Sequence, residues 1–149
     1  MSFERIVWTP EMSVGCDVLD DDHKLLISCL NDFVEACEND EGVFVIDPIF
    51  RVLMHYTEFH FEREEQIIEA CGFPELEHHR QVHTDMTEKV HEAREQFMMT
   101  PSKMLEDDVK TFLLSWLQEH ILEEDMGYRE YMRDNQETVT RILAEMDTN

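Results

Sequence analysis

Glycine and proline are scarce in this sequence, which contains four of each among its 149 residues. Because both residues interrupt regular secondary structure, their scarcity favours long uninterrupted elements. Apolar residues make up 42% of the chain, which suits a packed, helix-rich protein and argues against a disordered one. The length suits one domain, which we expect to cover residues 1–149.

Basic residues are also few, since 12 of them stand against 35 acidic residues and give a net charge of −23. Such a surface repels nucleic acid and anionic membranes, so we expect neither as a partner. No apolar run approaches the roughly 20 residues that cross a bilayer. The N-terminal stretch MSFERIVWTPEMS lacks the basic start and apolar segment of a signal peptide. We therefore expect a cytoplasmic protein.

The cysteines lack the spacing of a metal or redox motif. The four of them stand at positions 16, 29, 37 and 71, and no two form a C-x-x-C pair. This argues against a zinc ribbon and against a thioredoxin-type dithiol. We expect buried, unpaired thiols.

Four long segments repeat their apolar residues at the spacing of an amphipathic helix. We expect bundle helices over roughly 20–38, 48–71, 75–99 and 102–132, and a tail helix over roughly 136–147. Asp20 or Asp21 is a candidate cap for the first helix, and Asp47 with Pro48 predicts the start of the second. Because the breaks between them are short, the predicted fold is all-α. It is an antiparallel up-down four-helix bundle with an N-terminal loop segment and a short C-terminal helix.

Polar side chains interrupt the apolar stripes of all four predicted helices. In the second helix the predicted inward stripe reads Ile49, Leu53, Tyr56, His60, Glu64, Ile67 and Cys71. Over the four helices the polar members are His23, His60, Glu64, His79, His83 and His120. A single histidine on an apolar face is more often a hydrogen-bonded core residue than a metal ligand. Five histidines with a carboxylate among them are costly to bury separately, and a metal centre satisfies them together.

The stretch EHHRQVH shows which neighbouring histidine faces inward. Adjacent helical positions point about 100° apart, whereas residues four apart share a face. His79 and His83 are four apart, so we expect both at the metal centre and His78 at the surface. His55 and His91 also lie one position off their stripes, and we place them at the surface.

Histidine and carboxylate ligands without thiolate suit iron, manganese or zinc. Structural zinc needs only four ligands, so this set is too large for one such ion. Ferritin-like diiron bundles use mainly glutamate with Glu-x-x-His motifs. Here the spacings are His-x-x-x-Glu, His-x-x-x-His and His-x-x-x-x-Asp, which indicates a histidine-rich centre of another kind.

From Trp8 to about Tyr131 the sequence resembles the hemerythrins, specifically their single-domain bacterial form. The resemblance rests on VG before the first ligand, DDDHKLL, HFEREE, HHRQVH and WLQEHILEEDMGY. It implies two non-haem iron ions joined by an oxo or hydroxo bridge. The implied ligands of one iron are His79, His83 and His120, those of the other are His23 and His60, and both irons share Glu64 and Asp125.

The resemblance also implies reversible dioxygen binding, because these ligands leave one coordination position open. The family's oxygen pocket corresponds here to Leu26, Trp116, Leu117 and Ile121, although each could equally be ordinary core. Tyr128, one turn past Asp125, is expected to hydrogen-bond that carboxylate. We expect an oxygen carrier, store or delivery protein rather than an enzyme, and its oxygen acceptor could be another protein. The alternatives are an oxygen, redox or nitric oxide sensor, and an enzyme that reduces peroxide or nitric oxide at the same centre.

One spacing predicts a local irregularity in the fourth helix. His120 and Asp125 are five residues apart, which separates them by about 140° on a regular α-helix. Both can face the metals only if the helix widens or bends, as π-bulges at functional sites do. We therefore expect a break in the regular hydrogen-bond pattern between about 117 and 126.

Overall fold

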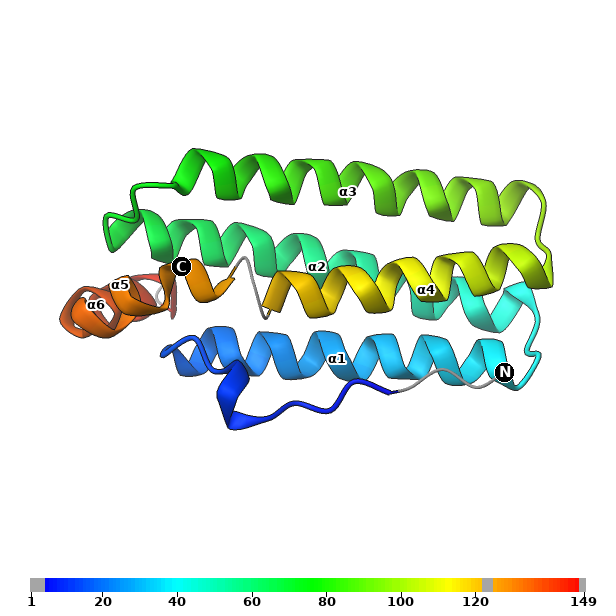
Figure 1. Cartoon of the computed structure of the whole chain (residues 1–149), viewed down its shortest axis with the longest axis horizontal. Helices are drawn as coiled ribbons and strands as arrows, with labels where there is room; N and C mark the ends of the chain where they lie inside the picture. The colour runs from blue at the N-terminus through cyan, green and yellow to red at the C-terminus, as the bar shows by residue number, and fades with distance from the viewer. Residues whose placement is uncertain (1–4, 122–124, 148–149) are drawn as a thin grey trace.

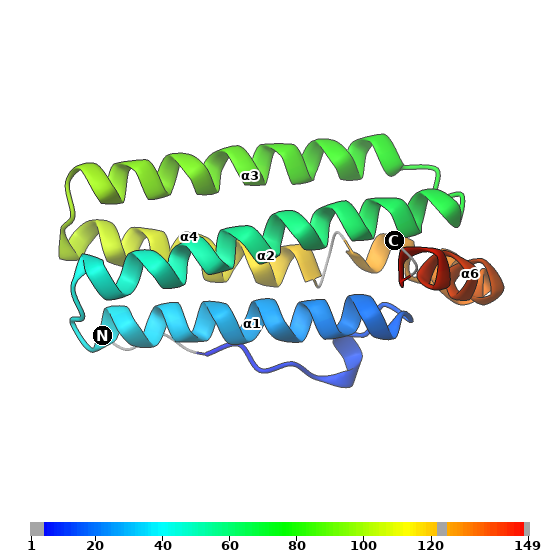
Figure 2. The same ribbon diagram turned by 180° about the vertical axis from the view of Figure 1, so that it is seen from behind.

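Four long helices run alternately up and down beside one another in the computed structural model (Figure 1). The structure describes residues 5–121 and 125–147, without the side chains of Asp125 and Asp147. The bundle helices are α1 (Asp17–Glu38), α2 (Val43–Ala70), α3 (Leu76–Met99) and α4 (Lys103–Glu119). The shorter elements are η1 (Pro10–Met12), η3 (Asp125–Tyr128), α5 (Arg129–Asp134) and α6 (Gln136–Asp147). The predicted all-α, antiparallel four-helix bundle is confirmed, and the view from behind shows the same order of helices (Figure 2).

The N-terminal segment lies along the outside of α1 and fixes the start of that helix. We predicted a cap at Asp20 or Asp21, but α1 already begins at Asp17. Asp20 lies inside the first turns, is buried, and accepts hydrogen bonds from the Val14 nitrogen at 2.9 Å and from Ser13 Oγ at 2.6 Å. The carboxylate therefore ties the preceding loop to the helix instead of capping it.

The prediction for the start of α2 was also wrong, because the helix begins at Val43 and carries Pro48 inside it. The early start buries Ile46 completely in the core. Asp47 does not cap the helix, and its two carboxylate oxygens accept hydrogen bonds from Arg94 of α3 at 2.9 and 3.2 Å. Burial of apolar surface and this ion pair outweigh the local cap signal.

Loops end the helices largely where the sequence indicated. Gly72, with a φ of 75°, follows α2 in the left-handed conformation that glycine adopts without strain. Ser102 caps α4 by accepting a hydrogen bond from the Leu105 nitrogen at 3.1 Å. Lys103 donates from Nζ to the Cys37 carbonyl at 2.7 Å, which joins the start of α4 to the end of α1.

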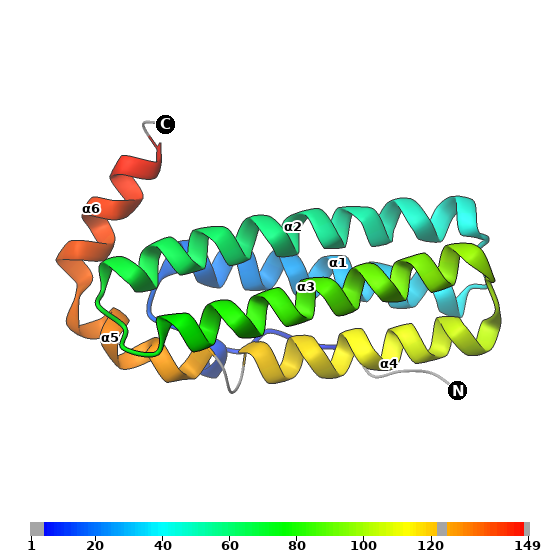
Figure 3. The ribbon, with the colours of Figure 1, turned by 90° about the horizontal axis from the view of Figure 1, so that it is seen from above.

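One apolar cluster fills the inside of the bundle, and a second one includes residues of η3, α5 and α6. Figure 3 shows α5 and α6 together at one end of the bundle. In α2 the inward stripe differs from the prediction at one position, because Tyr56 is 38% exposed and Thr57 is buried in its place. Val139 of α6 is buried in the second cluster, beside Ile67 and Met132. Among the described residues, no helix has the length and apolar character that a membrane span requires.

The chain leaves regular α-helical geometry at the end of α4, so the predicted continuous helix over 102–132 was wrong. His120 and Ile121 lie in a π-helical turn, and residues 125–128 form the short 3-10 helix η3. The predicted irregularity between about 117 and 126 is confirmed on both sides of residues 122–124, which lie outside the described part of the chain.

Candidate metal centre

Six of the seven predicted ligands converge inside the bundle, in the half that lies nearer to α5. Each is at most 3% exposed, and together they come from α1, α2, α3 and the π-helical turn that follows α4: His23, His60, Glu64, His79, His83 and His120. The four-residue spacing on α2 and α3 places two of these side chains per helix on the inward face. The side chain of Asp125, the seventh predicted ligand, lies outside the described residues.

The carboxylate of Glu64 stands at the middle of this cluster, with each oxygen facing a different group of histidines. Its Oε1 atom lies 2.6 Å from His79 Nε2, 3.0 Å from His83 Nε2 and 3.7 Å from His120 Nε2. Its Oε2 atom lies 3.0 Å from His60 Nε2 and 3.6 Å from His23 Nε2. By their contacts with this carboxylate, three histidines face Oε1 and two face Oε2.

Among the described side chains, two sets bring ligand atoms within 4.8 Å of one another, and Glu64 belongs to both. The first set is His23, His60, Glu64 and His120, and the second is Glu64, His79 and His83. Imidazole nitrogen and carboxylate oxygen are ligands that suit iron, manganese and zinc. The residues therefore fit a histidine-rich centre with a shared carboxylate.

The electrostatics of the cluster favour a bound cation. Burial raises the pKa of Glu64, but the charge and hydrogen bonds of His60, His23 and His79 outweigh it and hold the pKa well below its usual range. Burial, with repulsion from neighbouring histidines, lowers the pKa of His120 well below its usual value. Burial lowers the pKa of His60, but the charge of Glu64 and hydrogen bonds to Asp22 and Glu64 outweigh it and raise that pKa. The cluster therefore pairs an ionised Glu64 with a neutral His120, and a cation that binds there replaces the proton favoured on His60.

Tyr128 contacts this carboxylate directly. It is completely buried, and its hydroxyl donates a hydrogen bond to Glu64 Oε2 at 3.0 Å. The sequence predicted Asp125 as its partner, whose side chain is not described. The observed partner connects η3 to the half of the carboxylate that faces His23 and His60.

Aromatic rings pack on two of the histidines. Phe61 stacks face to face on His83, with ring centroids 3.8 Å apart and planes 4° apart. Trp116 stacks on His120 at 5.9 Å and 26°. The predicted inward stripe did not include Phe61, because this residue lies one position after His60. The buried face of a bundle helix is wider than a single stripe, and Phe61 lies within it.

The predicted oxygen-pocket residues all lie in the main core. Leu26, Trp116, Leu117 and Ile121 are between 0% and 6% exposed and belong to one apolar cluster. Burial alone does not separate a pocket wall from ordinary core, so their role in oxygen binding stays a prediction.

The remaining histidines lie where the helical phase placed them. His55, His78 and His91 are exposed, whereas His79 is buried. His91 pairs with Glu58 at 2.6 Å on the outer surface of α2 and α3.

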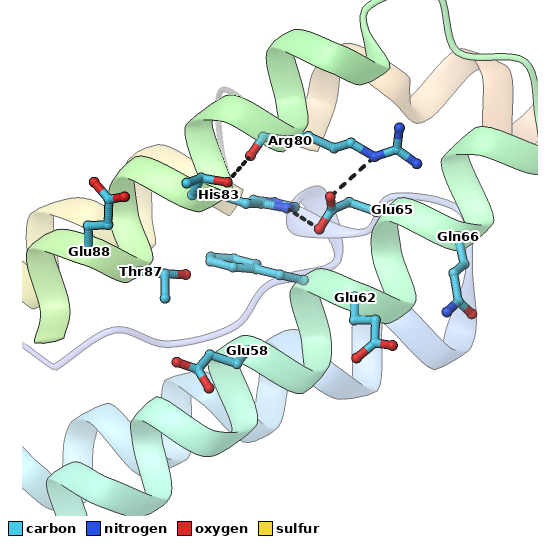
Figure 4. Close-up of a pocket in the computed structure, with 10 residues that line it drawn as sticks. Glu58, Glu62, Glu65, Gln66, Arg80, His83, Thr87 and Glu88 are labelled. Carbon is cyan, nitrogen blue, oxygen red and sulfur yellow. Dashed lines mark hydrogen bonds and ion pairs between the residues drawn. The ribbon is translucent and has the colours of Figure 1, made fainter.

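A groove of about 420 Å³ opens between α2 and α3 outside His83 (Figure 4). Glutamates border it on both helices, together with Arg80, and the Phe61–His83 stack closes its inner side. Glu65 contacts both His83 and Arg80 there. The sequence did not identify this layer of contacts around the histidines.

A four-helix bundle with a buried cluster of histidines around a carboxylate defines a metal-binding bundle protein of the histidine-rich class. Residues 14–131 match the family model described as the hemerythrin HHE cation binding domain. The chain belongs to the hemerythrin family.

Curated relatives agree with this assignment. The chain is 30% identical over 128 residues to a bacteriohemerythrin of Stenotrophomonas maltophilia. The aligned region covers 86% of this chain and 82% of that protein. It is 29% identical over 125 residues to a bacteriohemerythrin of Clostridium acetobutylicum, with coverages of 82% and 97%. It is 27% identical over 132 residues to a myohemerythrin of Riftia pachyptila, with coverages of 87% and 98%.

Proposed function

We propose that this protein binds dioxygen reversibly at a centre of two non-haem iron ions, as a carrier, store or delivery protein. The observation that carries the proposal is the position of Glu64, whose two oxygens face separate groups of three and two histidines. A carboxylate that faces two groups of histidines suits a position between two metal ions. A single ion would leave the histidines of one group without a metal to bind.

The family motif supports the ligand assignment, and the 3.7 Å between His120 Nε2 and Glu64 Oε1 agrees with it. His120 also has a ligand atom within 4.8 Å of those of His23 and His60, so the motif decides which iron it would bind. His79, His83 and His120 would hold one iron, and His23 and His60 would hold the other. Glu64 would be shared by the two, and by its match to the family motif Asp125 would be the second shared carboxylate. When bound, a ferrous pair would supply the two electrons that dioxygen takes up on binding.

The protein's own part is to orient these groups and to exclude water. Tyr128 holds Glu64 through the hydrogen bond to Oε2, which fixes the carboxylate without occupying Oε1. The apolar side chains of Leu26, Leu117 and Ile121 are almost completely buried. A dry, apolar wall keeps water and protons from the open position, which favours release of dioxygen over its reduction. We therefore propose a binding protein rather than an enzyme.

Support for oxygen as the ligand comes from the family. The alignments with the relatives named bacteriohemerythrin and myohemerythrin extend over most of the length of each relative. Hemerythrins bind dioxygen, and the present chain has their histidine and glutamate cluster.

Replacing the shared carboxylate tests the proposal. We expect the wild-type protein to contain two irons per chain and to take up one dioxygen for each iron pair. Glu64→Gln should reduce the iron content and abolish oxygen uptake, because an amide is a poor bridge between cations. Glu62→Gln is the control, since Glu62 is exposed on the same helix. A wild-type iron content in Glu64→Gln would show that the carboxylate does not bridge, and a two-iron wild type that takes up no oxygen would disprove oxygen binding.

A further inference from the structure

The outer nitrogen of His60 is held by a carboxylate from the neighbouring helix. Nδ1 of His60 lies 3.0 Å from Asp22 Oδ2. Asp22 sits on α1, directly before His23, and reaches across to α2. Because a carboxylate accepts hydrogen bonds, Nδ1 is the donor in this pair, and Nε2 is the nitrogen left to face Glu64.

An arginine fixes this carboxylate in turn. Arg63 donates from Nη2 to Asp22 Oδ1 at 2.8 Å, so the two oxygens of Asp22 serve different partners. Arg63 also lies over the ring of Phe59, with its guanidinium carbon 4.7 Å from the ring centroid, which restrains the guanidinium further. The result is a chain of contacts from Arg63 through Asp22 to His60.

The other group of histidines has a matching chain of contacts. Nδ1 of His83 lies 3.2 Å from Glu65 Oε2, and Arg80 Nε lies 3.4 Å from Glu65 Oε1 (Figure 4). Arg80 is shared more widely, because it also contacts Glu69 at 3.1 Å and Glu77 at 2.7 Å. Each of the two histidine groups thus includes one histidine whose outer nitrogen meets a carboxylate paired with arginine.

We propose that Asp22 and Glu65 are positioning residues, each fixed by an arginine, that keep His60 and His83 turned with Nε2 toward the metals. The proposal rests on the proposed function, since it assigns one such carboxylate to each iron. Partners of this kind orient a ligand histidine and raise its basicity. The arginine offsets the negative charge of the carboxylate, which would otherwise add to a strongly acidic surface.

The two pairs should differ in strength. The Asp22 and Arg63 side chains are 12% and 28% exposed, whereas Glu65 and Arg80 are 23% and 36% exposed and border the groove. Electrostatic contacts weaken as water gains access. We therefore expect changes at Asp22 to have a larger effect than changes at Glu65.

Replacement of Asp22 by asparagine gives a specific prediction. Arg63 requires an acceptor, so the asparagine oxygen should turn toward Arg63 and the amide NH₂ toward His60 Nδ1. Nδ1 of His60 then faces a hydrogen-bond donor instead of an acceptor, and the imidazole ring loses the hydrogen bond that orients it. If Arg63 is also replaced by methionine, the asparagine can rotate its oxygen back to Nδ1. The double variant Asp22→Asn/Arg63→Met should therefore recover part of what Asp22→Asn loses.

Two measurements on the full chain test this. The first is ferrous iron affinity, measured anaerobically against a competing chelator, which should fall by about 10–100-fold in Asp22→Asn and recover in part in the double variant. The second is the exchangeable proton signal of His60 Nδ1 in the NMR spectrum of the diferrous protein. In Asp22→Asn this signal should shift and exchange faster with solvent, and in the double variant it should return toward the wild-type position.

Asp47→Asn is a closely matched control. Asp47 and Arg94 also join two helices, their side chains are 13% and 29% exposed, and neither is a predicted ligand. This variant should leave the iron affinity and the His60 signal unchanged. Equal losses from Asp47→Asn and Asp22→Asn, or a double variant as weak as Asp22→Asn, would overturn the positioning role. A wild-type protein that binds two irons but no oxygen would disprove the proposed function alone, because neither readout depends on oxygen.

Discussion

The hydroxyl of Tyr128 should stabilise the centre by a measurable amount. Tyr128→Phe removes one oxygen and leaves the ring among its neighbours, of which Phe73 lies 6.1 Å away between centroids. The lost hydrogen bond is to the ionised, completely buried carboxylate of Glu64. Hydrogen bonds to charged groups contribute about 1.5–3 kcal/mol. For a chain of this length, a loss of about 2 kcal/mol should lower the melting temperature of the metal-free protein by about 4–8 °C.

Urea unfolding of the metal-free protein, followed by circular dichroism, measures this loss. Thr57→Val is the control, because Thr57 is also buried on α2 and donates to the Leu53 carbonyl at 2.7 Å without contacting Glu64. Tyr128→Phe should also weaken iron binding by about tenfold, as expected for loss of a hydrogen bond to a ligand carboxylate. Thr57→Val should leave iron binding unchanged. If Tyr128→Phe unfolds at the wild-type urea concentration and binds iron as tightly, the hydroxyl does not support Glu64.

Four further predictions follow from burial and backbone geometry. His79→Ala should lower the iron content measured by metal analysis while His78→Ala leaves it unchanged, and equal losses would show that the helical phase is wrong. Leu26→Ala should keep its iron yet speed the decay of the oxygenated absorption band in air, and an unchanged decay would make Leu26 ordinary core. Pro48→Ala should raise the free energy of unfolding by about 1–3 kcal/mol, because it restores a hydrogen-bond donor inside α2, and a lower stability would refute this. Burial raises the pKa of the Cys37 thiol to about 12. Iodoacetamide at pH 8 should therefore modify Cys37 only after unfolding, as peptide mass spectrometry would show, and rapid labelling of the native protein would contradict it.

The fold and the convergence of the histidines were predictable because both depend on periodicity. Three- and four-residue spacing marks the inward face of a helix. It correctly predicted that His79 is buried and that His78 is exposed. Predictions that used local cap signals failed at Asp20 and at Pro48. Asp20 instead holds the preceding loop through hydrogen bonds from Ser13 and Val14. At the start of α2 the chain gains more from burying Ile46 and pairing Asp47 with Arg94 than from the local cap.

The arrangement inside the centre could not be predicted from spacing. The division of the histidines by Glu64 depends on distances between helices, which no repeat along the chain encodes. Asp22 is the last of three consecutive aspartates in the sequence, and nothing in that run distinguishes it, yet it contacts His60 and Arg63 across the helix pair. Only the packing of α1 on α2 separates it from its acidic neighbours.

Reversible binding of dioxygen by a two-iron centre is tested most directly by one absorption experiment on protein of known iron content. The reduced protein is measured under argon, then in air, and then again after oxygen has been removed. With two irons per chain, a new band should form in air and vanish under argon over repeated cycles. A band that persists after oxygen removal, or a protein with one metal ion per chain, would contradict reversible oxygen binding at a diiron centre.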